Sequence, residues 1–393
     1  MTEQAPSAAR RHVLKQSIAL ASAAGLGSLA LPNAAHAAST RPCLLGMVPF
    51  PPVLNTGWDA AYQFIQDHGD AVALYFQDGV PWPQALQSSD MRTYPPSLQS
   101  VWDFNRTMRD GYLQGRPLIV AFNPLDTTYR ELSSLWADYP RQPLPEPWAT
   151  FAFDHPNVKQ ACLNYCIALV EYYQPTFLAI GVETNILLAR LPGQWSAYLK
   201  LHEFLYGELK RRYPSLYVFA SIQYEHMLGL HIDSAQLAEQ VKGFYPDVLR
   251  AEARRLMRSS DLVALSTYPF MVADAPLGPD WFQPAIDIAI ELGKPIAIEQ
   301  TGYTSKDVVS PFNTVLPGSE LLQAQFLWQV LIAALQYRFA FVINFIPIDY
   351  GTNFGTSFEA LTWANTGLRN TDGTDKFALR IWDWLLKQLA YTP

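Results

Sequence analysis

The chain has 393 residues, a formal net charge of −7 and only 16% charged residues. This acidic balance argues against a nucleic-acid partner and against binding to an anionic membrane surface, because both attract basic proteins. Trp, Tyr and Phe make up 13% of the chain, and a weakly charged, aromatic-rich surface suits neutral polymers such as sugars.

The first 37 residues have the pattern of an export signal. Arg10 and Arg11 form a twin-arginine pair, residues 18–31 are small and apolar, and residues 35–37 give an A-x-A cleavage site. The sequence therefore predicts a twin-arginine signal peptide over residues 1–37 and one catalytic domain over residues 38–393. We expect the mature protein to be periplasmic or secreted, without insertion into the membrane.

Apolar runs typical of strands alternate with helical segments along the rest of the chain. The eight predicted strands span residues 44–48, 71–76, 117–122, 176–181, 216–222, 262–266, 295–298 and 341–345. The eight predicted helices span residues 58–66, 97–110, 156–173, 195–211, 246–257, 281–292, 319–337 and 376–389. Nearly continuous apolar strands indicate a parallel sheet that is buried on both faces.

Eight such strand–helix units predict an α/β fold of the (β/α)8 TIM-barrel type in a single domain. A doubly wound open sheet is the alternative, and the count of eight favours the closed barrel. The first predicted strand is not followed by the glycine-rich fingerprint of dinucleotide-binding folds.

The cysteines and histidines give no sign of a bound group. Cys43, Cys162 and Cys166 are an odd set, and the last two lie four residues apart on a predicted helix, where bridging geometry is poor. The chain contains no C-x-x-C and no H-E-x-x-H motif, so we predict no metal site and no cofactor.

Two glutamates stand at the ends of predicted strands, Glu183 after the fourth and Glu299 after the seventh. A single such glutamate is most simply a helix cap. In a barrel, however, the loops that follow the strands form one rim, where catalytic groups are placed. Two carboxylates on different strands are what glycoside hydrolysis needs, one to protonate the leaving oxygen and one to meet the positive charge at the sugar carbon.

Other polar or aromatic residues at the same rim are candidates for substrate binding. They follow successive strands or lie in the rim loops: Asp78, Trp82, Asn123, Asn185, Gln223, Tyr268, Tyr303, Asn344 and Trp363. The polar residues would bond sugar hydroxyls and the two tryptophans would stack on sugar rings, although a rim tryptophan can also simply cover the barrel. Glu225 lies at the same rim after the fifth strand, without an assigned role.

Two segments resemble the retaining clan A glycoside hydrolases. The segment Ile298-Glu299-Gln300-Thr301-Gly302-Tyr303 looks like the nucleophile motif of that clan, and residues 261–270 (DLVALSTYPF) are similar to the strand-six motif of endo-β-1,4-galactanases. The resemblance implies a (β/α)8 barrel with Glu183 as general acid/base and Glu299 as nucleophile. It also implies that the two carboxylates lie roughly 5–5.5 Å apart, as in retaining enzymes. Tyr268 would donate a hydrogen bond to Glu299.

The chain departs from the clan pattern at two positions. Val182 stands where an asparagine usually precedes the acid/base, so Asn185 or another strand would have to replace it. Asn344-Phe345 stands where strand eight often ends in tryptophan. These departures keep two alternatives open beside hydrolysis: a glycan-binding barrel of a polysaccharide assembly system, and a transglycosidase. In each case we expect a carbohydrate partner and a monomeric protein.

Overall fold

The computed structural model describes residues 40–231, 247–272, 275, 277–278, 280–311, 313–388 and 390–391. The chain divides by its contacts into two units, Met1–Thr40 and Arg41–Pro393. The barrel belongs to the second unit. The predicted export signal over residues 1–37 lies outside the described residues.

A single parallel sheet forms the centre of the molecule, in the strand order β6-β5-β4-β3-β2-β12-β9-β8-β7. Its strands are β2 (Leu44–Met47), β3 (Ala71–Phe76), β4 (Leu118–Phe122), β5 (Phe177–Ala179), β6 (Tyr217–Phe219), β7 (Ser221–Gln223), β8 (Val263–Thr267), β9 (Ile296–Thr301) and β12 (Phe341–Asn344). The predicted eight strand positions are all present, because β6 and β7 together occupy the fifth.

The barrel closes within this fifth strand. Only Ala220 separates β6 from β7, yet β6 pairs with β5 on one side and β7 pairs with β8 on the other. The Ser221 amide also donates to the carbonyl of Gly181, which extends β5. The sheet thus returns to its own starting edge, as the (β/α)8 prediction requires, and the open-sheet alternative is excluded.

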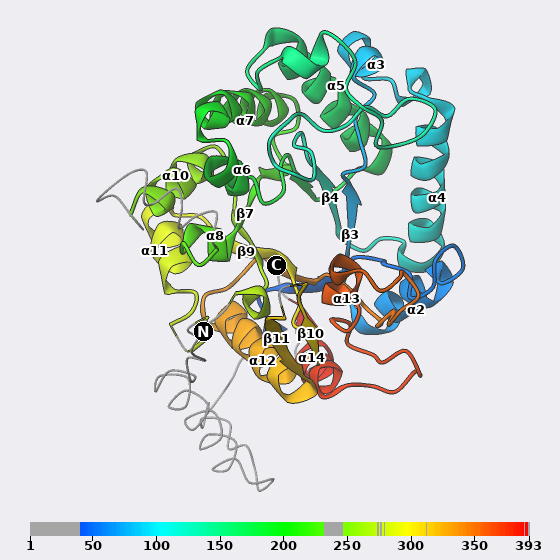
Figure 1. The fold of residues 1–393 in the computed structure, drawn as a ribbon, viewed down its shortest axis with the longest axis vertical. Helices are drawn as coiled ribbons and strands as arrows, with labels where there is room; N and C mark the ends of the chain where they lie inside the picture. Colours follow the sequence, from blue (N-terminus) through cyan, green and yellow to red (C-terminus); the bar gives the residue numbers. More distant parts are fainter. Residues whose placement is uncertain are drawn as a thin grey trace, which may run out of the picture. The chain divides into compact units, whose positions relative to one another are not determined.

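Helices surround the sheet (Figure 1). The large ones are α2 (Trp58–His68), α4 (Pro96–Leu113), α5 (Pro156–Tyr173), α7 (Pro192–Arg212), α10 (Asp247–Arg258), α11 (Gln283–Leu292), α12 (Glu320–Gln336) and α14 (Phe377–Gln388). Proline opens α4, α5 and α7, where its missing N–H costs nothing. Their bounds confirm the eight predicted helices to within a few residues, apart from the predicted ends at 246 and 389, which lie outside the described residues.

Both faces of the strands are buried, which explains their unbroken apolar sequence. In β4, Leu118, Val120 and Phe122 belong to the large cluster packed against the helices. Ile119 and Ala121 belong instead to a separate apolar cluster inside the barrel. Alternate residues of a strand point to opposite faces, so a fully apolar run supplies both clusters.

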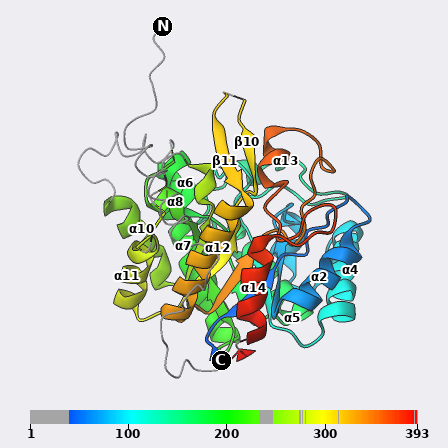
Figure 2. The ribbon, with the colours of Figure 1, turned by 90° about the horizontal axis from the view of Figure 1, so that it is seen from below.

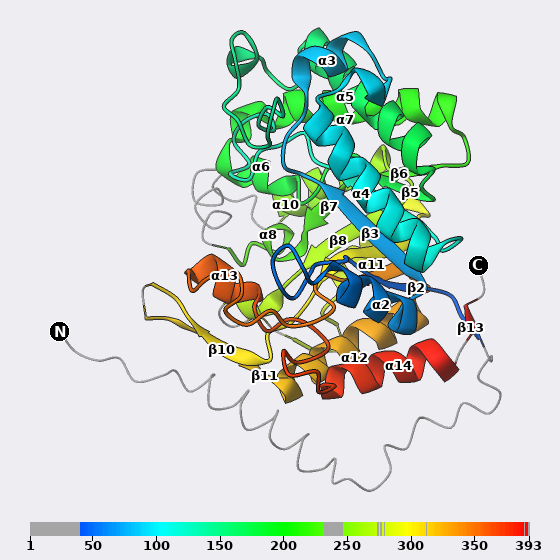
Figure 3. The same cartoon turned by 90° about the vertical axis from the view of Figure 1, so that its right-hand side faces the viewer.

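Shorter elements decorate the loops that follow the strands. They are α3 (Trp82–Gln87), η1 (Met91–Thr93), η2 (Trp148–Thr150), α6 (Asn185–Arg190), α8 (Tyr224–Met227), η3 (Pro269–Met271), α13 (Phe358–Trp363) and the hairpin of β10 (Lys306–Val309) with β11 (Val315–Ser319). Figures 2 and 3 show this hairpin beside α13, which it contacts. The hairpin lies outside the predicted strands. Two short strands, β1 (Thr40–Arg41) and β13 (Ala390–Tyr391), lie near the ends of the described chain.

All three cysteines are buried and free, which confirms that Cys162 and Cys166 are not bridged. Across the residues that the structure describes, no helix combines the length and the apolar character needed to span a bilayer.

Candidate active site

Glu183 stands in a tight turn between β5 and α6. Its backbone has a left-handed φ of +53°, a conformation that costs a non-glycine residue on the order of 1–3 kcal/mol and is concentrated at functional sites. Gly181 makes the turn possible, since a Cβ atom there would lie 2.6 Å from Cγ2 of Thr184 and would also collide with the Tyr198 hydroxyl. The Glu183 carboxylate is therefore oriented by a strained backbone.

Two hydroxyl groups bind the Glu183 carboxylate. Tyr129 donates to Oε2 at 2.9 Å, and Ser266 donates to Oε1 at 2.5 Å. Burial raises the pKa of Glu183, and these two hydrogen bonds oppose the rise because they favour the ionised form. The side chain is held in place by the loop that follows β4 and by the end of β8.

Glu299 lies within β9 and is completely buried. Its Oε2 accepts a hydrogen bond from Ser221 at 3.1 Å, whereas its Oε1 is buried without a partner. The pKa of Glu299 is raised to about 8, mainly by burial and also by the nearby charge of Glu183. The Tyr75 hydroxyl donates to the backbone carbonyl of Glu299 at 2.7 Å, which ties this point of β9 to β3.

Ser221 joins the two glutamates. Its Oγ accepts from the backbone N–H of Glu183 at 3.1 Å and donates to Oε2 of Glu299 at 3.1 Å. The ends of strands four and seven thus meet at one hydroxyl, although they lie far apart in the sequence. Two buried carboxyls that interact disfavour double ionisation, so this arrangement favours a single shared proton. The predicted separation of roughly 5–5.5 Å between the carboxylates stays a prediction.

Tyr268 lies beside the two glutamates, but without the expected hydrogen bond. Its hydroxyl is buried and has no hydrogen-bond partner, so the predicted donation to Glu299 is corrected. Burial and the charges of Glu183 and Glu299 raise its pKa well above the usual value. The site therefore contains two unpaired buried polar atoms, the Tyr268 hydroxyl and Oε1 of Glu299.

Trp363 lies beside Tyr268, and its expected stacking on a sugar ring stays a prediction. Its ring is only partly buried and meets the Tyr268 ring edge-on, with centroids 4.7 Å apart. Phe345 lies 5.4 Å from the same tryptophan. These two residues, from the loop after β12 and from α13, give this side of the site an aromatic wall without a tryptophan at the end of strand eight.

The four predicted amide side chains are buried and engaged inside the protein. Asn123 donates to the carbonyl of Val182 at 3.3 Å, and Asn344 donates to that of Ile346 at 2.7 Å. Asn185 exchanges two hydrogen bonds with the backbone of Gln223, at 2.9 and 2.7 Å. Gln223 itself donates to Glu225 and accepts from the amide of His226. These hydrogen bonds brace the loops, and both ends of the Asn185 amide are engaged. The expected contacts of the four side chains with a substrate stay predictions.

Three further candidates lie in other surroundings. Asp78 forms an exposed ion pair with Arg141 at 2.6 Å. Trp82 is completely buried and donates from its indole N–H to Ser133, so it belongs to the core and offers no face for stacking.

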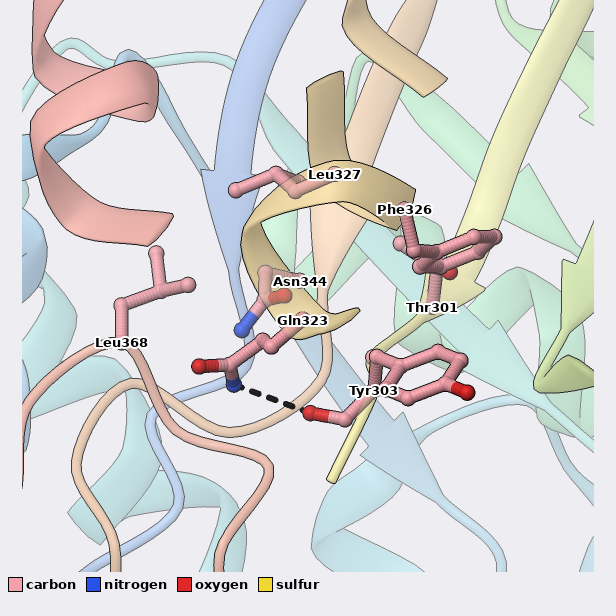
Figure 4. Close-up of a pocket in the computed structure, with 8 residues that line it drawn as sticks. Thr301, Tyr303, Gln323, Phe326, Leu327, Asn344 and Leu368 are labelled. Carbon is pink, nitrogen blue, oxygen red and sulfur yellow. Dashed lines mark hydrogen bonds between the residues drawn. The ribbon is translucent and has the colours of Figure 1, made fainter. Parts of the chain in front are cut away.

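Tyr303 is also buried, and it lines a narrow pocket beside α12 in which Gln323 donates to its carbonyl oxygen (Figure 4). Asn344 lines the same pocket. The positions of Tyr303 and Asn344 at the ends of strands predicted that their side chains face the rim. Packing instead directs them into the pocket beside α12.

Sequence reasoning missed the residues that hold the glutamates: Tyr75, Tyr129, Ser221 and Ser266. The two serines could have been noticed as hydroxyls near the ends of strands five and six, but nothing in their spacing names their partners. Glu225 was noticed only as a rim residue. It is completely buried, and burial raises its pKa to about 7. In the described part of the chain, no three His, Cys, Asp or Glu side chains gather as metal ligands would.

No protein-family model matches the sequence, and no match is found among curated proteins. Solved structures do match. A structure from a study of two fungal β-1,4-galactanases aligns over 86% of this chain and 98% of its own, with a TM-score of 0.52 and 15% identity. A GH5_18 protein from Streptomyces cattleya, in complex with GlcNAc, aligns over 90% and 83%, with a TM-score of 0.56 and 15% identity.

A GH5_18 protein from Bifidobacterium longum subsp. longum, in complex with Manβ1-4GlcNAc, aligns over 89% of this chain and 80% of its own. Its TM-score is 0.58 and its identity is 12%. At these identities the likeness concerns the path of the chain. The protein therefore shares the (β/α)8 barrel fold of structurally characterised glycoside hydrolases.

Proposed function

We propose that the protein is a retaining glycoside hydrolase that acts on an oligosaccharide or polysaccharide. The observation that carries this proposal is the meeting of Glu183 and Glu299, from strands four and seven, on the single hydroxyl of Ser221. The fold, shared with glycoside hydrolases, supports the same reading.

In the proposed first step, the Glu299 carboxylate attacks the anomeric carbon while the bond from that carbon to the leaving oxygen breaks. Glu183 gives its proton to this oxygen, so a glycosyl ester of Glu299 forms and Glu183 becomes ionised. In the second step, Glu183 takes a proton from water, the water oxygen bonds to the anomeric carbon, and the ester bond breaks. Both carboxyl groups return to their starting states.

The substrate-free site favours the shared proton on Glu299. This glutamate is the more deeply buried of the two and leaves Oε1 without a donor, whereas two hydroxyls stabilise the Glu183 carboxylate. Attack by Glu299 therefore requires that the proton first moves to Glu183. A reversed assignment, with Glu299 as acid and Glu183 as nucleophile, would need no such transfer and is the rival that labelling must exclude.

A glycan screen with product mapping tests the proposal. We expect hydrolysis of at least one polysaccharide or aryl glycoside, with a first product of retained anomeric configuration by NMR. Peptide mapping of the trapped glycosyl-enzyme should find the sugar on Glu299, and label on Glu183 would establish the reversed roles. The surface variant Glu291→Gln, whose residue pairs with Arg254 on the outer helices, serves as a matched carboxylate control with unchanged activity.

The same screen separates the remaining alternatives. Transfer of the sugar to an acceptor other than water would identify a transglycosidase with the same two glutamates. Binding of a glycan without any turnover would leave the glycan-binding barrel and reject the hydrolase.

We also propose export by the twin-arginine route, on the strength of Arg10, Arg11 and the A-x-A site at residues 35–37. The double variant Arg10→Lys/Arg11→Lys should retain the precursor in the cytoplasm, whereas the unaltered chain should be found processed outside it. Export of both chains alike would reject this route.

A further inference from the structure

Glu225 is a third buried glutamate at the rim, and both of its carboxylate oxygens accept hydrogen bonds from the protein. It follows β7 directly, on the short helix α8. Its Oε1 accepts from the Thr267 hydroxyl at 2.6 Å and from the Tyr268 amide at 3.0 Å, and its Oε2 accepts from the Gln223 side chain at 2.6 Å. Two of these three donors, Thr267 and Tyr268, belong to the end of β8. Glu225 therefore connects the end of β7 to the end of β8.

The tied segment carries two groups that meet the proposed catalytic pair. Ser266 donates to Glu183, and Tyr268 places its unpaired hydroxyl where it interacts with the charges of Glu183 and Glu299. From the other side, the Thr301 hydroxyl on β9 donates to the carbonyl of Thr267 at 2.9 Å. Thr267 is thus held on one side by Glu225 and on the other by Thr301. Its neighbours Ser266 and Tyr268 interact with the glutamates.

We propose that Glu225 is a positioning residue for the proposed hydrolysis, which holds the end of β8 so that Ser266 and Tyr268 keep their places beside Glu183 and Glu299. The part of this inference that concerns turnover rests on the proposed function. Both oxygens of Glu225 are occupied by donors of the protein itself, and this geometry supports positioning rather than contact with substrate.

Electrostatics supply a readout that packing alone would not give. The titratable groups that interact with Glu225 include Glu183, Tyr224 and Tyr268. The Ser266 hydroxyl lowers the pKa of Glu183, because its hydrogen bond favours the ionised carboxylate. If Glu225 positions Ser266, replacing Glu225 by a neutral isostere should weaken this hydrogen bond and raise the pKa of Glu183.

The test compares Glu225→Gln with Asp261→Asn in the full mature chain. Asp261 precedes the opposite end of β8 and bonds the Val218 amide at 2.8 Å and the Tyr206 hydroxyl at 2.9 Å, so it is a matched structural carboxylate away from the site. For E225Q we expect kcat to fall by roughly 10- to 100-fold, because a displacement of about 1 Å in a supporting group can cost about 10²-fold. The control should melt at a lower temperature and keep its kcat.

The second measurement is a carboxyl titration by NMR on protein with δ-¹³C glutamate, with the Glu183 signal assigned by its loss in Glu183→Gln. E225Q should raise the pKa of Glu183, because the hydrogen bond from Ser266 weakens, and Asp261→Asn should leave it unchanged. An unchanged Glu183 titration together with unchanged kcat in E225Q would overturn the proposal. If E225Q does not fold, Thr267→Val removes one of the three donors, and wild-type kcat in that variant would overturn it equally.

Failure of the proposed function would be visible separately. If the unaltered protein cleaves no glycoside, the titration and a crystal structure of E225Q still decide the positioning claim. Ser266 and Tyr268 in their original places, with an unshifted Glu183, would reject it.

Discussion

Two clusters of buried ionisable side chains in the barrel are built in opposite ways. The glutamate cluster (Glu183, Glu225 and Glu299) gathers like charges at the ends of strands four, five and seven. The lysine cluster (Lys376, Asp349 and Ser305) joins opposite charges in the loops before α14. Lys376 is completely buried and donates to Asp349 at 2.7 Å, to Ser305 at 2.9 Å and to two carbonyls.

The difference lies in how well each cluster is satisfied. Asp349 in the lysine cluster also accepts from the Gly367 amide at 2.9 Å, so the pair is surrounded by partners. The hydrogen bonds to the glutamate cluster come from hydroxyl, amide and backbone N–H groups, and the charge of Arg190 lowers the pKa of Glu183. Among the residues that the structure describes, Oε1 of Glu299 and the Tyr268 hydroxyl have no hydrogen-bond partner. A substrate can form hydrogen bonds with protein groups that have no partner within the protein. The lysine cluster therefore suits stability, and the glutamate cluster suits chemistry.

The largest expected effect is in the glutamate cluster. Glu299→Gln should abolish turnover while the fold stays intact, because the amide keeps the shape but cannot act as nucleophile. Steady-state kinetics on the glycoside found by screening is the measurement. Activity within about threefold of wild type would reject the nucleophile role.

Glu183→Ala should lose activity according to the leaving group. Substrates with poor leaving groups need its proton and should be severely impaired, whereas activated aryl glycosides should be affected less. Added azide should partly restore turnover of the activated substrates and yield a glycosyl azide of retained configuration. Equal losses on both classes, with no azide product, would contradict the acid/base assignment.

Lys376→Met should affect stability rather than chemistry. Removal of one partner leaves Asp349 buried without its counter-ion, which typically costs about 3–5 kcal/mol of unfolding free energy. Urea unfolding measures this loss, and kcat at a temperature where the variant is folded should stay near the wild-type value. A stable variant with impaired kcat would erase the distinction between the two clusters.

The smallest effect concerns the pH dependence of stability. The folded-state pKa of Glu299 is raised to about 8, above the usual value of about 4.3 in an unfolded chain. Between these values the folded protein binds the extra proton, so the free energy of unfolding falls as pH rises.

Glu225, with its pKa raised to about 7, and Asp349, raised to about 6, act in the same direction at lower pH. Glu299→Gln should therefore flatten the curve between about pH 4.3 and about pH 8, and its gain in stability over the wild type should reach roughly 1–3 kcal/mol at about pH 8, since it removes a carboxyl group that must ionise while buried. Urea midpoints at about pH 5 and about pH 8 provide the comparison. A slope identical to that of the wild type would show that Glu299 is not the group that titrates.

Much of the fold followed from local pattern. Eight apolar runs, each followed by a helical segment, predict a barrel because only a sheet covered on both faces makes such strands uniformly apolar. The interruption of strand five at Ala220 and the hairpin after β9 did not follow, since both depend on how neighbouring segments pair. The two glutamates could be selected because parallel strands bring their carboxyl ends to one rim.

What the sequence by itself determined was therefore which residues stand at the rim. Only the tertiary structure decided which way each side chain turns. Asn123, Asn185, Gln223 and Asn344 stand at the positions expected, yet their amides satisfy buried backbone and side-chain groups, because such groups cannot go unpaired without cost. The partners that hold Glu183 come from 54 and 83 positions away, and no local periodicity encodes contacts of that range. The orientation of these side chains and their hydrogen-bond partners depend on the packing of the whole barrel. Burial in the barrel also raises the pKa of its carboxyl groups.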